Sequence, residues 1–274
     1  MHSEPADFTE LEAFAVDLAR AAGEVILPLF RADIDSENKA RAGERYDPVT
    51  AADRASESVI RKRIGERYPE HGVLGEEFGA DRTDQEFVWV IDPIDGTRAF
   101  MAGLPLWTTL IALRHRGQPI IGLIAQPYLG EVFVGGPNGS RLLKGDAETR
   151  LRTRACPLLT DAVIATTDPN LFDGAETGAF AQVRAAARLA RFGCDAYAYA
   201  MVAMGRIDLV IESGLKAWDY EPLIPVVEGA GGYVRNWRGD DVDGSGQIVA
   251  AGDARCLDEA LTSLRRSALR QSAS

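Results

Sequence analysis

Asp92 and Asp95 are the two residues whose chemistry stands out in this 274-residue sequence. They come directly after Phe87–Ile91, an apolar run rich in aromatic and β-branched residues, which predicts a buried strand. Pro93 lies between them and cannot donate to a sheet, so the strand is expected to end there. Two carboxylates at the end of a buried strand are costly unless a cation neutralises them.

Gly96 and Thr97 complete this motif. A glycine allows the backbone to approach a ligand closely, and the amides of Gly96 and Thr97 would face an anion if a helical turn begins there. Carboxylates and anion-binding amides fit together if cations lie between them. Because Mg²⁺ prefers oxygen ligands, the motif predicts a magnesium site that holds a phosphate.

Three further acidic residues, Asp53, Glu76 and Asp219, lie near the predicted ends of strands or the beginnings of helices. Each has an ordinary alternative role. Asp219 stands where aspartate often caps a helix, Asp53 can pair with Thr50 in a capping box, and Glu76 can be a solvated loop residue. Taken singly, each of the three residues favours its structural role over a catalytic one.

The first half of the chain predicts two helices followed by an antiparallel meander, an α+β pattern. Apolar residues at helical spacing predict helices at Glu10–Phe30 and Ala55–Tyr68, with a polar loop or flap at Asp33–Tyr46. Strands are predicted at Val73–Glu77, Phe87–Ile91, Trp107–Arg114, Pro119–Gln126, Glu131–Val134 and Ser140–Lys144. This N-terminal part, with most of the metal-binding motifs, is expected to cover residues 1–148.

The second half, residues 149–274, alternates strands and helices, an α/β pattern. Thr149–Leu159 is expected to cross between the halves. The predicted strands are Ala162–Thr166, Ile207–Ile211, Tyr233–Trp237 and Ile248–Ala251, and the predicted helices are Gly178–Ala190, Ala196–Met204, Asp219–Ala230 and Leu257–Leu264. Both halves should pack sheets against helices.

The composition argues against several classes of protein. Lys+Arg 30 against Asp+Glu 41 gives a formal net charge of −11, which argues against a nucleic-acid partner. No apolar run approaches ~18 residues, so no membrane span is expected. Cys156, Cys194 and Cys256 are widely spaced and fit neither a zinc pattern nor a disulfide framework, which predicts a cytoplasmic protein.

Four motifs together resemble the inositol monophosphatase family. They keep the family's order along the chain, and the one around Asp92 is highly specific. The motifs are Asp47-Pro48-Val49-Thr50-Ala51-Ala52-Asp53, Gly75-Glu76-Glu77, Trp89-Val90-Ile91-Asp92-Pro93-Ile94-Asp95-Gly96-Thr97, and Trp218-Asp219 with Gly229-Ala230-Gly231-Gly232. The resemblance implies a layered αβαβα sandwich and a Mg²⁺-dependent phosphomonoesterase that acts on a small phosphorylated alcohol.

The resemblance also assigns the acidic residues to two or three Mg²⁺ ions. Glu76, Asp92 and the backbone carbonyl of Ile94 resemble the ligands of a first ion. Asp92, Asp95 and Asp219 resemble the ligands of a second ion, with Asp92 bridging the two. A third, weaker ion would share Glu76. Asp95 and Asp219 would also face the substrate.

The catalytic water and the phosphate have expected partners as well. Asp53 and Thr97 resemble the pair that orients and deprotonates the attacking water in this family, with Glu76 beside them. The amides of Gly96 and Thr97 would bind phosphate oxygens. Cleavage of a phosphate ester needs such groups, because the charge on the phosphoryl oxygens must be neutralised and the water made nucleophilic.

The segment Arg191–Tyr197, which contains Gly193 and Asp195, resembles the family's substrate-recognition loop. Glu212 matches a family residue that contacts the leaving alcohol. Many inositol-specific members carry a small residue at the position of Asp195. The pocket for the alcohol would therefore contain two acids besides the metal ligands.

Two extra acids suit an alcohol that carries a cation, such as the amine and imidazole of histidinol. Gly193–Asp195, Arg98–Phe100 and Leu223–Pro225 are most similar to the histidinol-phosphate phosphatase branch. Histidinol phosphate is therefore the predicted substrate. The alternative is inositol phosphate or another small sugar phosphate, in which case Asp195 would only cap the helix that follows it.

A third hypothesis, from another class, is a non-enzymatic regulatory or binding protein on the same fold. The matching metal-ligand positions weigh against it. A homodimer is implied by the resemblance alone.

Overall fold

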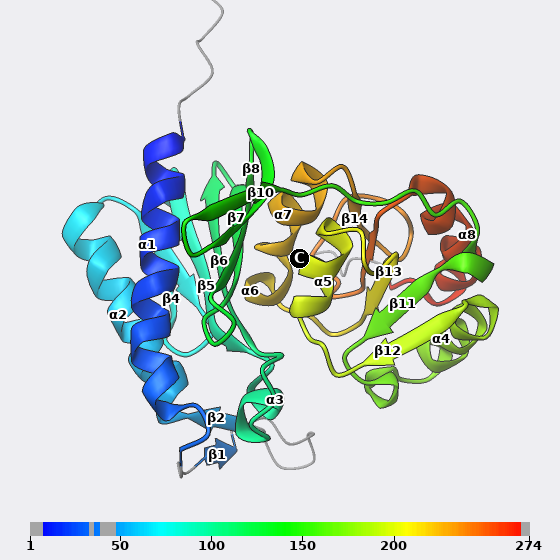
Figure 1. Cartoon of the computed structure of the whole chain (residues 1–274), viewed down its shortest axis with the longest axis horizontal. Helices are drawn as coiled ribbons and strands as arrows, with labels where there is room; N and C mark the ends of the chain where they lie inside the picture. Colours follow the sequence, from blue (N-terminus) through cyan, green and yellow to red (C-terminus); the bar gives the residue numbers. More distant parts are fainter. Residues whose placement is uncertain (1–7, 33–35, 39–47, 270–274) are drawn as a thin grey trace, which may run out of the picture.

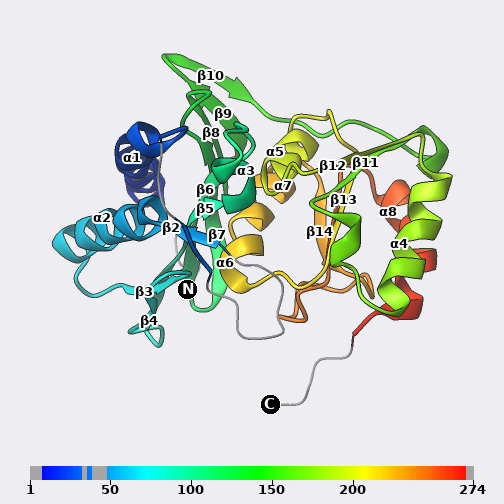
Figure 2. The same cartoon turned by 90° about the horizontal axis from the view of Figure 1, so that it is seen from below.

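Two large sheets, one two-stranded sheet and three layers of helices make up the fold, as the computed structural model of residues 8–32, 36–38 and 48–269 describes it. Figure 1 shows a helix pair on the left, then a sheet, a middle layer of helices, a second sheet and an outer helix pair. Figure 2 shows the same succession from below. The predicted αβαβα sandwich is confirmed.

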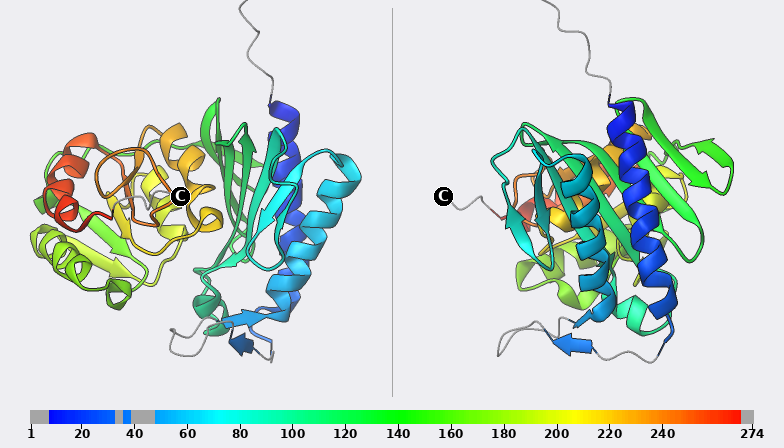
Figure 3. Two further views of the ribbon diagram at one scale, coloured as in Figure 1. Left: turned by 180° about the vertical axis from the view of Figure 1, so that it is seen from behind. Right: turned by 90° about the vertical axis from the view of Figure 1, so that its left-hand side faces the viewer.

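The first layer consists of α1 (Thr9–Ile26) and α2 (Ala51–Arg67), which lie side by side across one face of the first sheet (Figure 3). The α1 helix ends in a short 3₁₀ turn at Leu27–Leu29. Its buried positions recur at helical spacing and pack on the sheet, as an amphipathic helix requires. They include Ala15, Leu18, Ala22 and Ile26.

The first sheet has eight strands in the order β10-β9-β8-β7-β6-β5-β3-β4. Every neighbouring pair is antiparallel except β3 and β5, which run parallel. The strands are β3 (Gly72–Gly75), β4 (Gly79–Asp81), β5 (Phe87–Asp95), β6 (Thr108–His115), β7 (Gln118–Gln126), β8 (Glu131–Gly136), β9 (Gly139–Lys144) and β10 (Ala147–Arg150). The meander from β5 to β9 follows the prediction, while β4 and β10 are additions at the two edges.

Pro93 does not end β5, which contradicts the prediction. Asp92 pairs with Leu110 and Asp95 pairs with Thr108, so β5 carries one residue more than β6 between these two pairs. A proline is tolerated at such a bulge because the extra residue does not need to donate to the ladder. The bulge therefore lets the strand continue through the motif that carries both aspartates.

The second sheet has five strands in the order β12-β11-β13-β15-β14. Strand β11 runs parallel to both of its neighbours, β12 and β13, whereas β15 is antiparallel to β13 and β14. The strands are β11 (Val163–Thr166), β12 (Leu189–Phe192), β13 (Leu209–Glu212), β14 (Tyr233–Asn236) and β15 (Ile248–Ala251).

Helices cover both faces of this sheet. The middle layer consists of α5 (Tyr197–Ala203), α6 (Ala217–Tyr220) and α7 (Leu223–Gly229), and α7 packs against β7, β8 and β9 of the first sheet. The outer pair is α4 (Ala175–Ala186) and α8 (Ala254–Leu264). Among the described residues, no helix combines the length and apolarity needed to cross a bilayer.

Three predicted elements are wrong. The helix predicted to reach Ala190 ends at Ala186, and Leu189–Phe192 instead pairs with β11 as an edge strand, a long-range contact that local periodicity does not reveal. The helix predicted from Asp219 breaks at Pro222, which cannot continue the hydrogen-bond pattern.

The third correction concerns the predicted flap, Asp33–Tyr46. Ser36–Asn38 forms a short strand, β1, against β2 (Pro48–Thr50). The rest of that prediction falls mostly on residues outside the described ranges.

Candidate active site

A cavity of about 370 Å³ lies between the first sheet, α6 and the end of β13. Nine of the predicted site residues line this cavity, namely Glu76, Asp92, Ile94, Asp95, Gly96, Thr97, Asp195, Glu212 and Asp219. Two other predicted residues, Asp53 and Gly193, are absent from its lining. The wall also contains Arg98, Thr167, Leu171, Ser213, Gly214, Leu215, Lys216 and Trp218.

Glu76 and Asp92 come together because β3 and β5 are parallel neighbours. Gly75 pairs with Ile91, and the Glu76 amide donates to the Ile91 carbonyl at 3.1 Å. The next residue on each strand is an acid, and both strands end at the same edge of the sheet. Strand order thus joins two motifs that lie apart in the sequence.

Glu57 supports this edge from α2 and was not among the predicted site residues. Its carboxylate accepts hydrogen bonds from the amides of Glu77 (2.7 Å) and Phe78 (3.2 Å), and from Arg61 Nε (2.7 Å). These bonds fix the turn that carries Glu76. Helical spacing held a signal for Glu57, because it shares the buried face of α2 with Ile60 and Ile64.

The densest charge in the cavity belongs to Asp92, Asp95 and Asp219. Carboxylate oxygens of the three residues all lie within 4.8 Å of one another. Burial raises the pKa of Asp92 well above its ordinary value, and the charges of Glu76, Asp95 and Asp219 raise it further. The pKa of Asp95 is raised in the same way, by burial and then by the charges of Asp195 and Asp219.

This donor set fits Mg²⁺. It consists of oxygens only, Asp92 is buried and the other two acids are half-buried, and the described residues around it offer no histidine or thiolate for a softer metal. A divalent cation would remove the repulsion among the carboxylates. The Asp92 Oδ1 also accepts the Ile94 amide at 3.0 Å, which orients one of the proposed ligands.

Asp219 has the helix-capping role that the sequence allowed, and it also lines the cavity. It is the third residue of α6, and its carboxylate accepts the Lys216 amide at 2.7 Å. The same carboxylate faces Asp92 and Asp95 in the cavity. The helix start therefore holds the side chain in place for the metal site.

Gly96 has a left-handed conformation, with φ of 81°, immediately before α3 (Thr97–Met101). A Cβ at this position would lie 3.1 Å from the Asp195 carboxylate, so a larger residue would strain the backbone and crowd that acid. Thr97 Oγ1 donates to the Ile94 carbonyl at 3.1 Å. The glycine thus brings the phosphate-binding motif against the predicted substrate loop.

Asp53 is buried and completes the predicted capping box of α2. Its Oδ2 accepts the Thr50 amide at 2.8 Å and the Thr50 hydroxyl at 2.6 Å. Its Oδ1 is buried and lacks a hydrogen-bond partner among the described residues, so it can accept a bond from water. Burial raises the pKa of Asp53. The hydrogen bonds of Asp53 and Thr97 go to Thr50 and Ile94 rather than to each other.

Asp195 does not cap α5. The N-cap residue of that helix is Ala196, and no side chain caps the helix there. The Ala196 amide instead donates to Asp95 Oδ2 at 2.7 Å. Asp195 itself has a positive φ of 44°, a conformation uncommon for residues other than glycine. Burial raises its pKa to about 6. The capping alternative for Asp195 is therefore wrong.

Glu212, the last residue of β13, is only 3% exposed. Its carboxylate accepts hydrogen bonds from the Thr167 amide (2.7 Å), the Thr167 hydroxyl (3.0 Å) and the Thr166 hydroxyl (3.2 Å). Burial nevertheless raises its pKa to about 8. Asp195, which is half-buried, and Glu212, which is buried, thus place two carboxylates in one cavity.

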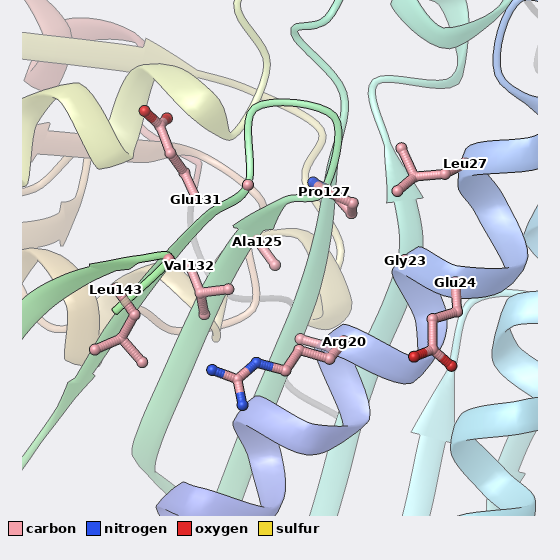
Figure 4. Close-up of a pocket in the computed structure, with 12 residues that line it drawn as sticks. Arg20, Gly23, Glu24, Leu27, Ala125, Pro127, Glu131, Val132 and Leu143 are labelled. Carbon is pink, nitrogen blue, oxygen red and sulfur yellow. The ribbon is translucent and has the colours of Figure 1, made fainter. Parts of the chain in front are cut away.

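A second cavity, of about 360 Å³, lies between α1 and strands β7 to β9. Apolar residues such as Leu27, Val132 and Leu143 line much of it, while Glu131 points away from it toward α5 (Figure 4). None of the predicted site residues contributes to it. The cavity with the acidic cluster is therefore the candidate active site.

Comparison with known proteins agrees with this geometry. Residues 7–270 match the family model of the inositol monophosphatase family. The chain is 43% identical over 271 residues to "Bifunctional phosphatase IMPL2, chloroplastic" of Arabidopsis thaliana, covering 93% of this chain and 76% of the relative. It is 35% identical over 240 residues to a histidinol-phosphatase of Chlorobaculum parvum, covering 86% and 90%.

A solved structure of an inositol monophosphatase from Zymomonas mobilis has the same fold. It superposes with a TM-score of 0.85 at 37% identity and covers 95% of this chain and 100% of the other. These relatives are named as enzymes, which favours an enzyme over the regulatory alternative. The chain belongs to the inositol monophosphatase family and is a phosphatase.

Proposed function

We propose that this phosphatase hydrolyses L-histidinol phosphate to L-histidinol and phosphate, a step of histidine biosynthesis. The observation that carries the proposal is the pair of carboxylates in the cavity of the acidic cluster, the buried Glu212 and the half-buried Asp195. A cationic alcohol pairs with carboxylates through charge as well as hydrogen bonds, whereas a neutral polyol offers hydrogen bonds alone. The histidinol-phosphatase named among the relatives supports the same choice.

Two or three Mg²⁺ ions are the proposed cofactors. Glu76, Asp92, Ile94 through its carbonyl, Asp95 and Asp219 would hold them. When bound, the ions would neutralise phosphoryl charge and make water nucleophilic. The protein's own contribution is to hold these oxygens at one edge of the sheet before the substrate arrives.

The attacking water is the proposed partner of Asp53, Thr97 and Glu76. The buried Oδ1 of Asp53 is available to accept a proton or a hydrogen bond. Thr97 Oγ1 already donates to the Ile94 carbonyl, so it can accept a bond from the water. The amides of Gly96 and Thr97 would bind phosphate oxygens.

Inositol phosphate is the second candidate substrate. It is favoured by the structural similarity to an inositol monophosphatase, which extends over 95% of this chain. Both substrates would use the same metal site and the same water. They differ in what the alcohol offers to Asp195 and Glu212.

Hydrolysis of histidinol phosphate and of myo-inositol 1-phosphate, measured side by side with Mg²⁺, tests the proposal. We expect kcat/KM for histidinol phosphate to be higher by at least about tenfold, because each buried ion pair with substrate is worth more than about 1.4 kcal/mol. Asp195→Ala should lower that value about tenfold and leave the inositol ester within about twofold. A wild-type preference for the inositol ester would contradict the proposed substrate.

We also propose a homodimer in the cytoplasm, as the resemblance implies. Met101, Leu104 and Tyr128 are exposed apolar or aromatic side chains, and contact with a second copy would bury them. The free thiols Cys156, Cys194 and Cys256 suit a reducing compartment. Light scattering of the purified protein measures its mass directly, and a monomer at micromolar concentration would refute the dimer.

A further inference from the structure

Thr167 lies between the two acids of the alcohol pocket. It follows β11, which stands between β12 and β13 and runs parallel to both. Parallel strands end at the same edge of a sheet, so the residue after β11 lies beside the loop after β12 and beside the last residue of β13. That loop contains Asp195, and that last residue is Glu212.

Thr167 contacts both the end of β13 and the loop after β12. Its amide and its hydroxyl both donate to Glu212 Oε1, at 2.7 Å and 3.0 Å. Its carbonyl accepts the Gly193 amide at 2.8 Å, which anchors the predicted substrate loop. Thr167, Asp195 and Glu212 also line one small cavity beside the acidic cluster. One residue therefore bonds Glu212 and anchors the loop that carries Asp195.

The single proton of the Thr167 hydroxyl makes this arrangement selective for ligands that carry several donors. Thr167 has one hydroxyl proton, and it goes to Glu212, so the same proton is not available to Asp195. A ligand with several N–H donors, such as an ammonium or imidazolium group, can bond both carboxylates at once. One hydroxyl of a neutral alcohol donates a single proton and bonds only one of them.

We propose that Thr167 is a positioning residue for substrate selection: it fixes the Glu212 and Asp195 carboxylates side by side so that both can pair with one cationic group on the leaving alcohol. This inference rests on the proposed function and names the residue that sets the spacing of its two acids. Thr167 acts through Glu212 and Asp195, not on the reacting atoms.

Thr167→Val and Thr167→Ser test the inference as a matched pair. Valine keeps the branched shape and the backbone groups but removes the hydroxyl, and serine keeps the hydroxyl. We expect Thr167→Val to raise KM for histidinol phosphate about tenfold with kcat within about twofold, because a hydrogen bond to a charged group is lost. Thr167→Ser should stay within about twofold of the wild type in both constants.

Thr177→Val is the control for a hydrogen-bonded threonine hydroxyl outside the site, because Thr177 Oγ1 donates to the Phe172 carbonyl at the start of α4, outside the lining of the cavity. Its kinetic constants should equal those of the wild type. Equal KM values for Thr167→Val and the wild type would overturn the inference, and so would equal losses in Thr167→Val and Thr167→Ser.

The wild-type enzyme separates the two proposals. A wild type that does not hydrolyse histidinol phosphate overturns the proposed function, and the inference falls with it. A wild type that prefers histidinol phosphate, together with a Thr167→Val variant that keeps the same preference, overturns the inference alone.

Discussion

At the scale of single residues, the candidate active site is distinguished by carboxylates that the fold brings close together. Asp92 is 2% exposed, and its carboxylate lies among those of Asp95 and Asp219. Such a group destabilises the protein unless a cation is bound, because burial and the neighbouring carboxylates both disfavour its charge. The proposed metal ligand should therefore reduce the stability of the metal-free protein.

Asp92→Asn tests this relation between stability and metal binding. We expect phosphate release to fall by at least about a hundredfold, since bound metal contributes several kcal/mol to the transition state. In metal-free buffer, the variant should melt at the same or a higher temperature than the wild type, because one buried charge is gone. Adding Mg²⁺ should raise the melting temperature of the wild type only.

Asp161→Asn provides the control, because Asp161 is exposed on the 3₁₀ turn Leu159–Asp161. It should keep both the activity and the thermal response to Mg²⁺. If Asp92→Asn hydrolyses substrate at the wild-type rate, the assignment of Asp92 to the metal site is wrong.

At the scale of elements, Asp253, the N-cap residue of α8, connects that helix to the crossover segment Thr149–Leu159. The Asp253 carboxylate accepts the Arg255 amide at the start of α8 and the Cys156 amide of the crossover, each at 3.0 Å. An ion pair with Arg255 adds to these bonds, and together they lower the pKa of Asp253 to about 2. The ionised carboxylate is therefore the form that stabilises the fold.

Asp253→Ala should lower the free energy of unfolding by about 1–2 kcal/mol at neutral pH, the cost of losing a helix cap. A carboxyl whose folded-state pKa is lowered contributes its full stabilisation above its unfolded pKa, about 3.9. The difference between wild type and variant should shrink as the pH falls from about 4 to about 2. Urea denaturation at several pH values measures it.

Asp258→Ala is the matched control on α8, because Asp258 is exposed on the same helix. Its unfolding free energy should stay within about 0.5 kcal/mol of the wild type at every pH. A pH-independent difference for Asp253→Ala would show that the charge of Asp253 plays no part.

At the scale of the whole molecule, glycines let the middle helices lie directly on the first sheet. A Cβ on Gly122 would lie 2.1 Å from the Pro222 carbonyl oxygen, and one on Gly135 would lie 2.2 Å from the Pro225 carbonyl oxygen. The α7 helix therefore contacts the strands through backbone. Because α6 and Asp219 directly precede α7, this contact also sets the position of a proposed metal ligand.

Gly135→Ala should displace α7 and lower the free energy of unfolding by about 1–3 kcal/mol or more, the cost of overpacking a close contact. Phosphate release should fall as well, since Asp219 moves with the helix. Urea denaturation and the phosphatase assay measure the two effects.

We expect the opposite effect on stability from Gly65→Ala, because Gly65 lies within α2 and no neighbouring atom lies within 4 Å of the added carbon. It should raise the free energy of unfolding by about 0.5–1 kcal/mol. Equal stability of the two variants would mean that the close contact with α7 is unimportant.

Much of the fold follows from local patterns in the sequence. Helical spacing predicts α1, alternation and turn residues predict the meander from β5 to β9, and Thr50 with Asp53 predicts the cap of α2. Two local predictions failed because distant residues decided them. The edge strand Leu189–Phe192 forms only through pairing with β11, and Pro93 stays in β5 only because β6 accommodates a bulge.

The sequence by itself determined that Asp92 and Asp95 call for a cation, because a carboxylate at the end of an apolar run is costly wherever the chain folds. Only the tertiary structure decided which of the acidic residues meet. Strand order brings Glu76 to Asp92 and places Thr167 between Asp195 and Glu212, and strand order depends on contacts between residues far apart in the chain. For this reason the acids were named from the sequence, and Glu57 and Thr167, which hold them in position, were not.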